Sequence, residues 1–291
     1  MTNPIEIFDR ALLRQRKARA ASGMSDHGFL VEHAALDFAE RISIMQRHFE
    51  TCLDLGAHGL FLSERLHETG KTGRIMRASP VTELCFHEDS ACIVCDEEAL
   101  PFAPESLDLV VSAAGLHLVN DLPGTLLQIR RCLKPDGLFL ASMLGGNSLE
   151  QLRTAFAKAE IATTGGLSPR VAPFADIRQL GQLLQRAGFA LPVADTDSLD
   201  VTYPSALGLM RDLKSMGVSN MLRDRRKVPL RRATLAAAIE AYASEFGKGG
   251  LVPATFEIVT LTGWAPHASQ QQPLRPGSAR GSLKAAIDGG G

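Results

Sequence analysis

The sequence has no excess of charge of one sign, because 31 basic and 32 acidic residues leave a formal net charge of −1. This balance argues against a partner held by a global positive field, such as nucleic acid. No apolar run approaches the roughly 18 residues that cross a bilayer, and the first 20 residues lack the apolar centre of a secretion signal. What remains is a chain of 291 residues whose 45% hydrophobic content suffices for a large core.

Cysteine is also scarce, with five residues at positions 52, 85, 92, 95 and 132. The odd count in a chain of this length is atypical of a disulfide scaffold and favours a reducing compartment. Cys92 and Cys95 form one CxxC without a second, and strand residues three apart face opposite sides. We therefore expect buried strand cysteines rather than a metal or redox site. The triplet His87-Glu88-Asp89, with His117 as a candidate third iron ligand, is expected to be a solvated turn.

Short apolar runs alternate with helical patterns through the middle of the chain. The runs cover 51–56, 73–79, 91–96, 107–115 and 137–144, and helical patterns cover 60–68, 123–133, 147–160 (with Asn147 as its cap) and 176–189. Continuous apolar strands that alternate with helices predict a parallel sheet covered on both faces. Later runs at 198–204 and 255–265 bring the number of strands to seven. The prediction is an α/β, Rossmann-like, doubly wound domain.

The chain divides into a central domain and two flanking parts. Helical patterns at 5–22 and 28–48 predict an N-terminal helical lid over 1–48, followed by the main domain over 49–267. Residues 205–247 form a helical insertion before the last strand. The polar, glycine-rich tail over 268–291 is expected to be disordered.

Ligands of open α/β sheets bind outside the carboxyl ends of the strands, so the residues after each strand are the candidates. Gly56 follows the first strand, where a glycine turn before a helix favours close approach of an anion. Asp96 follows the third strand and could accept from an exocyclic amine, while Leu100 contacts a flat ring. The full set of candidate cofactor-binding residues is Asp54, Gly56, His58, Ser79, Asp96, Glu97, Leu100, Ser112 and Leu116.

Four segments carry a resemblance when taken in order: LDLG (53–56), D-x-x-x-LPF (96–102), LDLVVS (107–112) and LKPDGLF (133–139). Together they resemble class I S-adenosylmethionine-dependent methyltransferases. Residues 7–21, 119–153, 165–174, 195–220 and 252–264 narrow the resemblance to the respiratory complex I assembly factor 5 family. It implies a methyltransferase fold, S-adenosylmethionine as cofactor, and hydroxylation or methylation of an arginine in a protein, with an iron–sulfur subunit of complex I as the partner.

The chain departs from its relatives at two places. In the family's D-x-G-x-G-x-G loop, Gly56 matches the first glycine, but His58 and Leu60 stand at the second and third. The ring of His58 either crowds the cofactor or points outward. Ser79 stands where a carboxylate normally binds the ribose hydroxyls. Two alternatives therefore stay open: a carboxyl O-methyltransferase for small or carrier-bound acids, which a more distant resemblance to the malonyl-carrier-protein methyltransferases implies, and an inactive assembly chaperone.

Basic residues gather within 211–232 of the insertion. They are Arg211, Lys214, Arg223, Arg225, Arg226, Lys227, Arg231 and Arg232. Such a patch could attract an acidic protein or a membrane surface, or it could be a solvated helix face. Because the family-like region begins near residue 5 and leaves no room for a leader, we expect a bacterial cytoplasmic protein, with peripheral contact to the inner membrane through this patch.

Overall fold

The computed structural model describes residues 6–85 and 91–271, and these form a seven-stranded mixed sheet. The strand order is β3-β2-β1-β4-β5-β7-β6. The bounds are β1 Phe49–Leu55, β2 Thr72–Ser79, β3 Cys92–Val94, β4 Leu107–Ala113, β5 Leu133–Leu144, β6 Ala190–Tyr203 and β7 Val252–Trp264. Only β7 among them runs antiparallel to its neighbours. The order reverses between β1 and β4, as in doubly wound sheets, so the predicted fold is confirmed.

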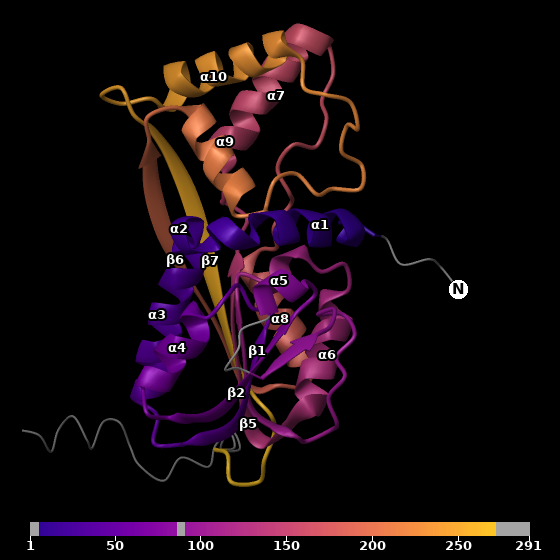
Figure 1. Ribbon diagram of the computed structural model, residues 1–291, viewed down its shortest axis with the longest axis vertical. Helices are drawn as coiled ribbons and strands as arrows, with labels where there is room; N and C mark the ends of the chain where they lie inside the picture. Colours follow the sequence, from indigo (N-terminus) through magenta and orange to yellow (C-terminus); the bar gives the residue numbers. More distant parts are fainter. Residues whose placement is uncertain (1–5, 86–90, 272–291) are drawn as a thin grey trace, which may run out of the picture.

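Helices cover both faces of the sheet, which explains why the central strands are apolar throughout. All seven residues of β4 are buried. On one face, α6 (Leu122–Cys132) and α8 (Ile177–Arg186) pack against the strands, and on the other face α3 (Phe29–Ser43) and α4 (Phe61–Glu68) do so. Figure 1 shows the two helix pairs on opposite sides of the sheet. A strand buried on both faces has no polar side to alternate with its apolar one.

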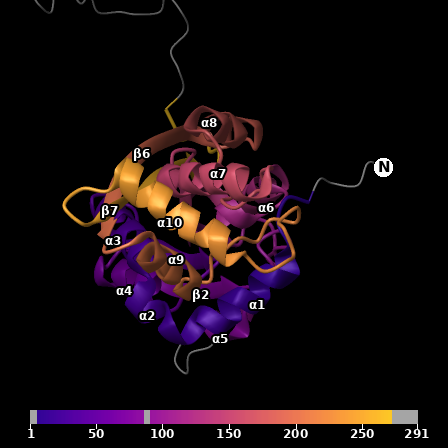
Figure 2. The same cartoon turned by 90° about the horizontal axis from the view of Figure 1, so that it is seen from above.

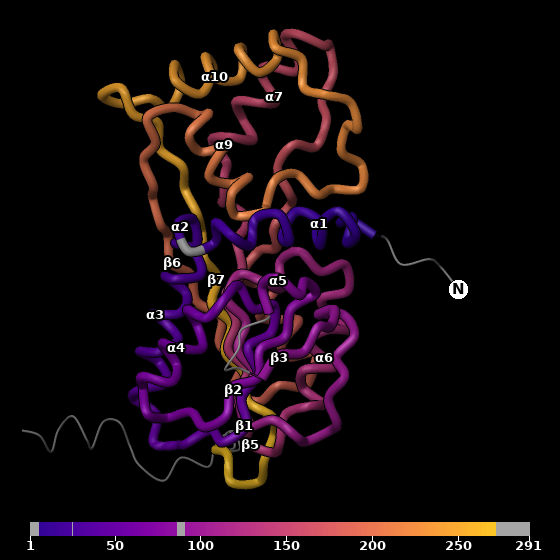
Figure 3. The backbone as a smooth tube through the Cα atoms, viewed as in Figure 1, coloured from indigo at the N-terminus to yellow at the C-terminus, as the bar shows by residue number. Residues whose placement is uncertain are grey.

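A second helical layer lies beyond the carboxyl ends of the parallel strands. It contains α7 (Glu150–Thr164), α9 (Ala206–Ser215) and α10 (Arg232–Phe246), with α7 and α10 side by side (Figure 2). The long strands β6 and β7 connect this layer to the sheet, as the tube in Figure 3 makes clear. Its apolar core includes Leu209, Tyr242 and Phe256. The helices α9 and α10 form the insertion expected between the last two strands.

The N-terminal segment lies between the sheet and this helical layer. Helix α1 (Arg10–Ala20) crosses there, followed by a short 3₁₀ turn (Ala21–Gly23) and α2 (Met24–His27). Phe8 packs with Leu13, Leu118 and Met221, which come from three separate parts of the chain. No helix in the described ranges is long and apolar enough to span a membrane.

One local expectation was wrong. Asn147 is not the cap of α7, because the helix begins at Glu150 and the amide of Asn147 donates to Glu257. Of the tail expected to be disordered, only 268–271 is described, and there Gln270 donates to Asp136 at 2.9 Å. The rest of the tail, 272–291, lies outside the described residues.

Candidate functional site

The carboxyl edge, by which we mean the residues that follow β1, β2, β3 and β4, begins with the turn after β1. Gly56 has φ +76°, a left-handed conformation that favours glycine. The backbone N–H groups of Gly56 and Ala57 both donate to the carbonyl of Ala78, at 2.8 and 2.9 Å, which fixes the turn against β2. Asp54 is buried, and burial raises its pKa to about 7, although Arg77 acts in the opposite direction.

The turns after β1 and β4 approach each other closely. A Cβ added at Gly56 would lie 3.3 Å from the Cα of Gly115, and one added at Gly115 would lie 2.9 Å from the Oγ of Ser112. Small residues at these positions therefore let the two chain segments meet at the point where the strand order reverses. Leu116 follows in a buried 3₁₀ turn (Leu116–Leu118).

Two histidines face the space beyond this meeting point. The rings of His58 and His117 line the same cavity, and each has a buried Nδ1 without a hydrogen-bond partner in the described part of the chain. The alternative in which His58 points outward is therefore wrong. Burial lowers the pKa of His117 to about 3 and that of His58 well below its usual value, and Lys17 acts in the same direction on both. Both rings are neutral at physiological pH.

The candidates after β2 and β3 are engaged by the protein itself. The Oγ of buried Ser79 accepts from the backbone N–H of Val81 at 3.4 Å. Arg10 of α1 donates to Asp96 at 2.6 Å and forms an ion pair with the fully buried Glu97. Leu100 is half-buried and packs against the main core cluster.

Arg10 and Lys17 are functional candidates that the sequence analysis missed. They lie seven residues apart on α1 with Leu13 between them, a spacing that places all three on one helix face. Lys17 is only 1% exposed, and its Nζ has no hydrogen-bond partner in residues 6–85 and 91–271. Burial lowers its pKa. The available signal was a basic residue on the apolar face of the first helical pattern.

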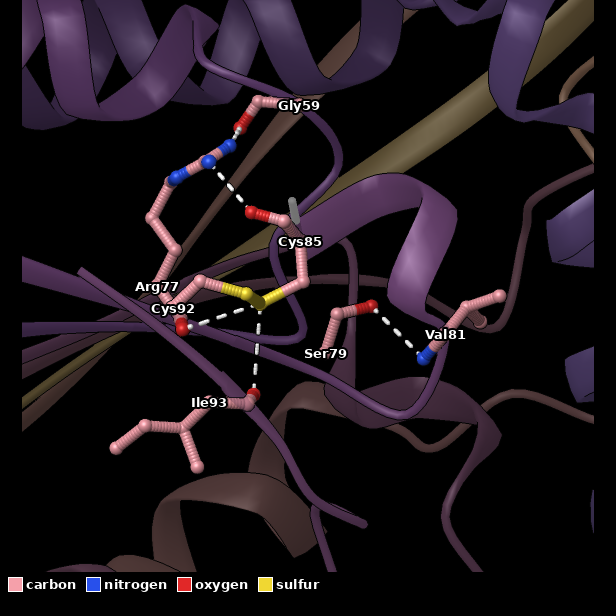
Figure 4. The surroundings of a disulfide bond; sticks show 7 residues. All are labelled: Gly59, Arg77, Ser79, Val81, Cys85, Cys92 and Ile93. Carbon is pink, nitrogen blue, oxygen red and sulfur yellow. Dashed lines mark hydrogen bonds between the residues drawn. A yellow bond between two sulfur atoms is a disulfide. The ribbon is translucent and has the colours of Figure 1, made fainter. Parts of the chain in front are cut away.

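The cysteine expectation was wrong. Cys92 forms a disulfide with Cys85, at the end of α5 (Thr82–Cys85) (Figure 4). Cys95 carries a free thiol. The side chain of Arg77 donates to the carbonyls of Cys85 and of Gly59, so it ties the disulfide to the turn after β1. The triplet His87-Glu88-Asp89 lies outside the described residues. Elsewhere, in the ranges that are described, no group of three His, Cys, Asp or Glu side chains could hold a metal ion.

A cavity of about 250 Å³ adjoins the carboxyl edge, between the sheet and the second helical layer. Its walls are mainly Leu, Val, Phe and Met side chains from several elements, and Arg170 and three histidines also line it. The set of lining residues contains neither Asp nor Glu. Arg170 is already paired with the buried Glu160, and His27 with Asp212, which leaves His58 and His117 as the titratable groups facing the cavity without a partner.

Two members of the basic patch form ion pairs within the protein. Arg223 pairs with Glu6, and Arg225 pairs with Asp9 at 3.1 Å, so both connect the insertion to the N-terminal segment. The remaining six members are exposed: Arg211, Lys214, Arg226, Lys227, Arg231 and Arg232.

Comparisons with known proteins agree with this architecture. Residues 53–141 match the model of a methyltransferase domain. A Danio rerio protein named arginine-hydroxylase NDUFAF5, mitochondrial, is 37% identical and aligns over 96% of this chain and 89% of its own length. The malonyl-[acyl-carrier protein] O-methyltransferase of Methylovorus sp. (strain MP688) is 31% identical, over 92% of this chain and 93% of its own.

Among solved structures, a Burkholderia thailandensis N-methyltransferase with bound S-adenosylhomocysteine has a TM-score of 0.50 at 16% identity, covering 92% of each chain. At that identity the likeness shows the fold alone. The near full-length relatives show more: the chain belongs to the family of the NDUFAF5 arginine-hydroxylases, built around a methyltransferase domain.

Proposed function

We propose that the protein binds S-adenosylmethionine at the carboxyl edge and modifies an arginine side chain of a partner protein. One observation carries the cofactor part: six buried polar atoms without hydrogen-bond partners in the described residues surround this edge. They are Lys17 Nζ, Asp54 Oδ2, His58 Nδ1, Glu97 Oε1, Ser112 Oγ and His117 Nδ1. Buried polar atoms are normally paired, and each unpaired one costs about 1–3 kcal/mol. A polar ligand that satisfied several of them would recover that free energy.

The residues present fit an adenosyl amino acid. Asp96 and Leu100 after β3 suit the adenine amine and ring, and Ser79 after β2 suits a ribose hydroxyl. Asp54 after β1 suits the ammonium group. Asp96 already accepts from Arg10, Arg14 and the backbone N–H of Glu98. An ionised carboxylate has about four acceptor sites, so about one site is left for a ligand amine. Names printed for relatives support the same cofactor, since methyltransferases occur among them.

When bound, the cofactor would supply an electrophilic methyl group on a sulfonium, which needs little activation by the protein. The chain's own residues would then orient the bound cofactor and enclose it. The buried turns around Gly56 and Gly115 would fix the position of the ligand. Of the N-terminal lid predicted over 1–48, α1 crosses the edge and would exclude water from the ligand, whereas α3 covers a face of the sheet. His58 and His117, both neutral, can exchange hydrogen bonds with a substrate at the cavity mouth.

The arginine target rests on the relatives, whose printed name is arginine-hydroxylase, and on the expected partner, an iron–sulfur subunit of respiratory complex I. Calorimetry with S-adenosylmethionine tests the cofactor: micromolar binding is expected, and no binding up to millimolar concentration favours an assembly chaperone or a cofactor of another kind. Peptide mass spectrometry of complex I subunits from a deletion strain tests the target. At least one arginine should lose a modification when the gene is absent, and unchanged masses at every arginine would refute the claim.

A second candidate is methylation of a carboxylate on a small or carrier-bound acid. The cavity favours it, because a guanidinium has five N–H donors that need acceptors and no Asp or Glu is among the residues lining the cavity. Transfer of a labelled methyl group separates the two candidates. A methyl ester is released as methanol by mild base, whereas a group on arginine survives the same treatment.

We also propose a bacterial cytoplasmic location, with the exposed basic residues of 211–232 facing the inner membrane or an acidic partner. Six exposed basic residues within 22 consecutive positions support such contact. Fractionation in low and high salt tests this placement: membrane association that disappears at high salt is expected, and equal distribution at both salt concentrations contradicts it.

A further inference from the structure

Lys17 is the most costly side chain of the carboxyl edge if nothing binds there. A buried ammonium group without a partner is strongly disfavoured, because it has lost its hydration without gaining hydrogen bonds. Its side chain is 1% exposed, and no described residue accepts a hydrogen bond from its Nζ. The same helix carries exposed basic residues, such as Arg14 and Arg19, that avoid this cost.

Two contacts fix α1, and therefore Lys17, over the edge. At its start, Arg10 pairs with Asp96 and Glu97 and also donates to the carbonyl of Leu118 at 3.1 Å. At its end, Ala18 and Ala21 contact the apolar cluster that contains Val81 and Leu84, after β2. The helix thus spans the edge. Lys17 lies between the two anchors, on the same face as Arg10.

The neighbours of Lys17 identify the part of the edge that it faces. Leu13, one turn before Lys17 on the same helix face, packs with Leu118, which follows β4. In agreement with this position, the charge of Lys17 disfavours protonation of His58, which follows β1, and of His117. Lys17 therefore lies near the point where the strand order reverses, the position where ligands cross doubly wound sheets. In the arrangement proposed above, adenine lies at β3 and the amino-acid part lies at β1 and β4. Glu97 is close enough to favour the charged form of Lys17, but it makes no hydrogen bond with it.

We propose that Lys17 binds the carboxylate of the cofactor's amino-acid part, with Asp54 opposite it for the ammonium group. This inference rests on the proposed cofactor. The α-carboxylate is the one anionic group of S-adenosylmethionine, and an ammonium donor is its natural partner. Lys17 would thus distinguish the complete cofactor from adenosyl compounds that lack the carboxylate.

A matched pair of ligands tests the assignment in the full-length protein. S-adenosylmethionine and decarboxylated S-adenosylmethionine differ only in the carboxylate, and calorimetry measures both. Wild-type protein should prefer the complete cofactor by roughly 10- to 150-fold, the range for one hydrogen bond to a charged group. Lys17→Met should lose most of that preference, with weaker binding of the complete cofactor and less than about 3-fold loss for the decarboxylated one.

Arg19→Gln, which removes an exposed charge from the same helix, is the control and should retain the wild-type preference. Several outcomes overturn the inference while leaving the proposed function intact: equal wild-type affinity for the two ligands, or equal weakening of both by Lys17→Met. The first of these needs no variant, so the test does not depend on whether Lys17→Met folds. If wild-type protein binds neither ligand, the proposed cofactor itself is wrong.

Discussion

Asp54→Asn should make the protein more stable at pH 8 and leave it unchanged near pH 4. Burial raises the pKa of this carboxyl from the ordinary 3.8 to about 7. The folded state therefore holds a proton that the unfolded chain has already released between these two values. Over this range, stability must fall as pH rises, because the unfolded state binds fewer protons than the folded state.

The size of the effect follows from the shift. About three pKa units at 1.36 kcal/mol each correspond to about 4 kcal/mol of destabilisation above pH 7. An asparagine has nearly the same shape and no charge, so the variant should avoid that cost. The difference in unfolding free energy between variant and wild type should be near zero at pH 4, grow from there to about pH 7, and then level off.

Urea unfolding followed by circular dichroism at several pH values measures this difference. His58 and His117 titrate with the opposite sign, because their lowered pKa values make stability rise with pH below about 6.5. They are present in both proteins, so subtraction removes their contribution. A difference that does not depend on pH would refute the reasoning, as would a variant less stable than wild type at pH 8. The same variant should bind S-adenosylmethionine more weakly, since the ammonium loses its carboxylate.

Three further changes test the surrounding framework. Gly56→Ala should lower the free energy of unfolding by about 1–3 kcal/mol, because a φ of +76° strains any residue with a side chain. Gly146→Ala is the control: an added Cβ there meets open space, so thermal unfolding should show a change within about 0.5 kcal/mol. Cys85→Ser should cost about 2.5 kcal/mol by loop-closure entropy; reductant should destabilise wild type to the same extent and leave the variant unaffected. Glu160→Gln leaves the mostly buried guanidinium of Arg170 without its charge partner and should lower the free energy of unfolding by about 3–5 kcal/mol. Glu245→Gln removes a carboxylate from a more exposed pair and should lower it by less than about 1 kcal/mol. Equal losses for the two variants would contradict the burial argument.

The sheet could be predicted because its central strands are buried on both faces and read as continuous apolar runs. The same reasoning fails for an edge strand. Residues 198–204 were predicted as a strand, but β6 extends over Ala190–Tyr203, and the part that the prediction missed contains Asp195 and Asp197. Among the strands of the described ranges, only β7 pairs with β6. One edge of β6 is therefore unpaired in this part of the chain, and polar residues are tolerated there. Hydrophobicity alone carries no signal for such a segment.

The site was harder to predict than the sheet, because its parts come from distant positions. Asp54, Gly56 and Asp96 could be found, since each directly follows a strand and the carboxyl ends of parallel strands meet at one edge. The contact between Arg10 and Asp96 spans 86 residues, and no periodic pattern encodes it. The disulfide could not be predicted for a different reason. Whether Cys85 or Cys95 pairs with Cys92 depends on where α5 ends relative to β3.

The departures of the glycine loop are best understood together with α1. A loop with His58 and Leu60 in place of glycines offers the ligand less open backbone, and Ser79 offers no charge. Helix α1 instead brings three cations to the edge, Arg10, Arg14 and Lys17, against the carboxylates of Asp54, Asp96 and Glu97. Arg10 and Arg14 already form ion pairs with these carboxylates, whereas Lys17 and Asp54 form none that the described residues show, and each has a buried atom without a hydrogen-bond partner there. Under the proposed binding mode, the ammonium and carboxylate groups of the cofactor would pair with Asp54 and Lys17, and the N-terminal helix would then recover affinity that the loop has lost.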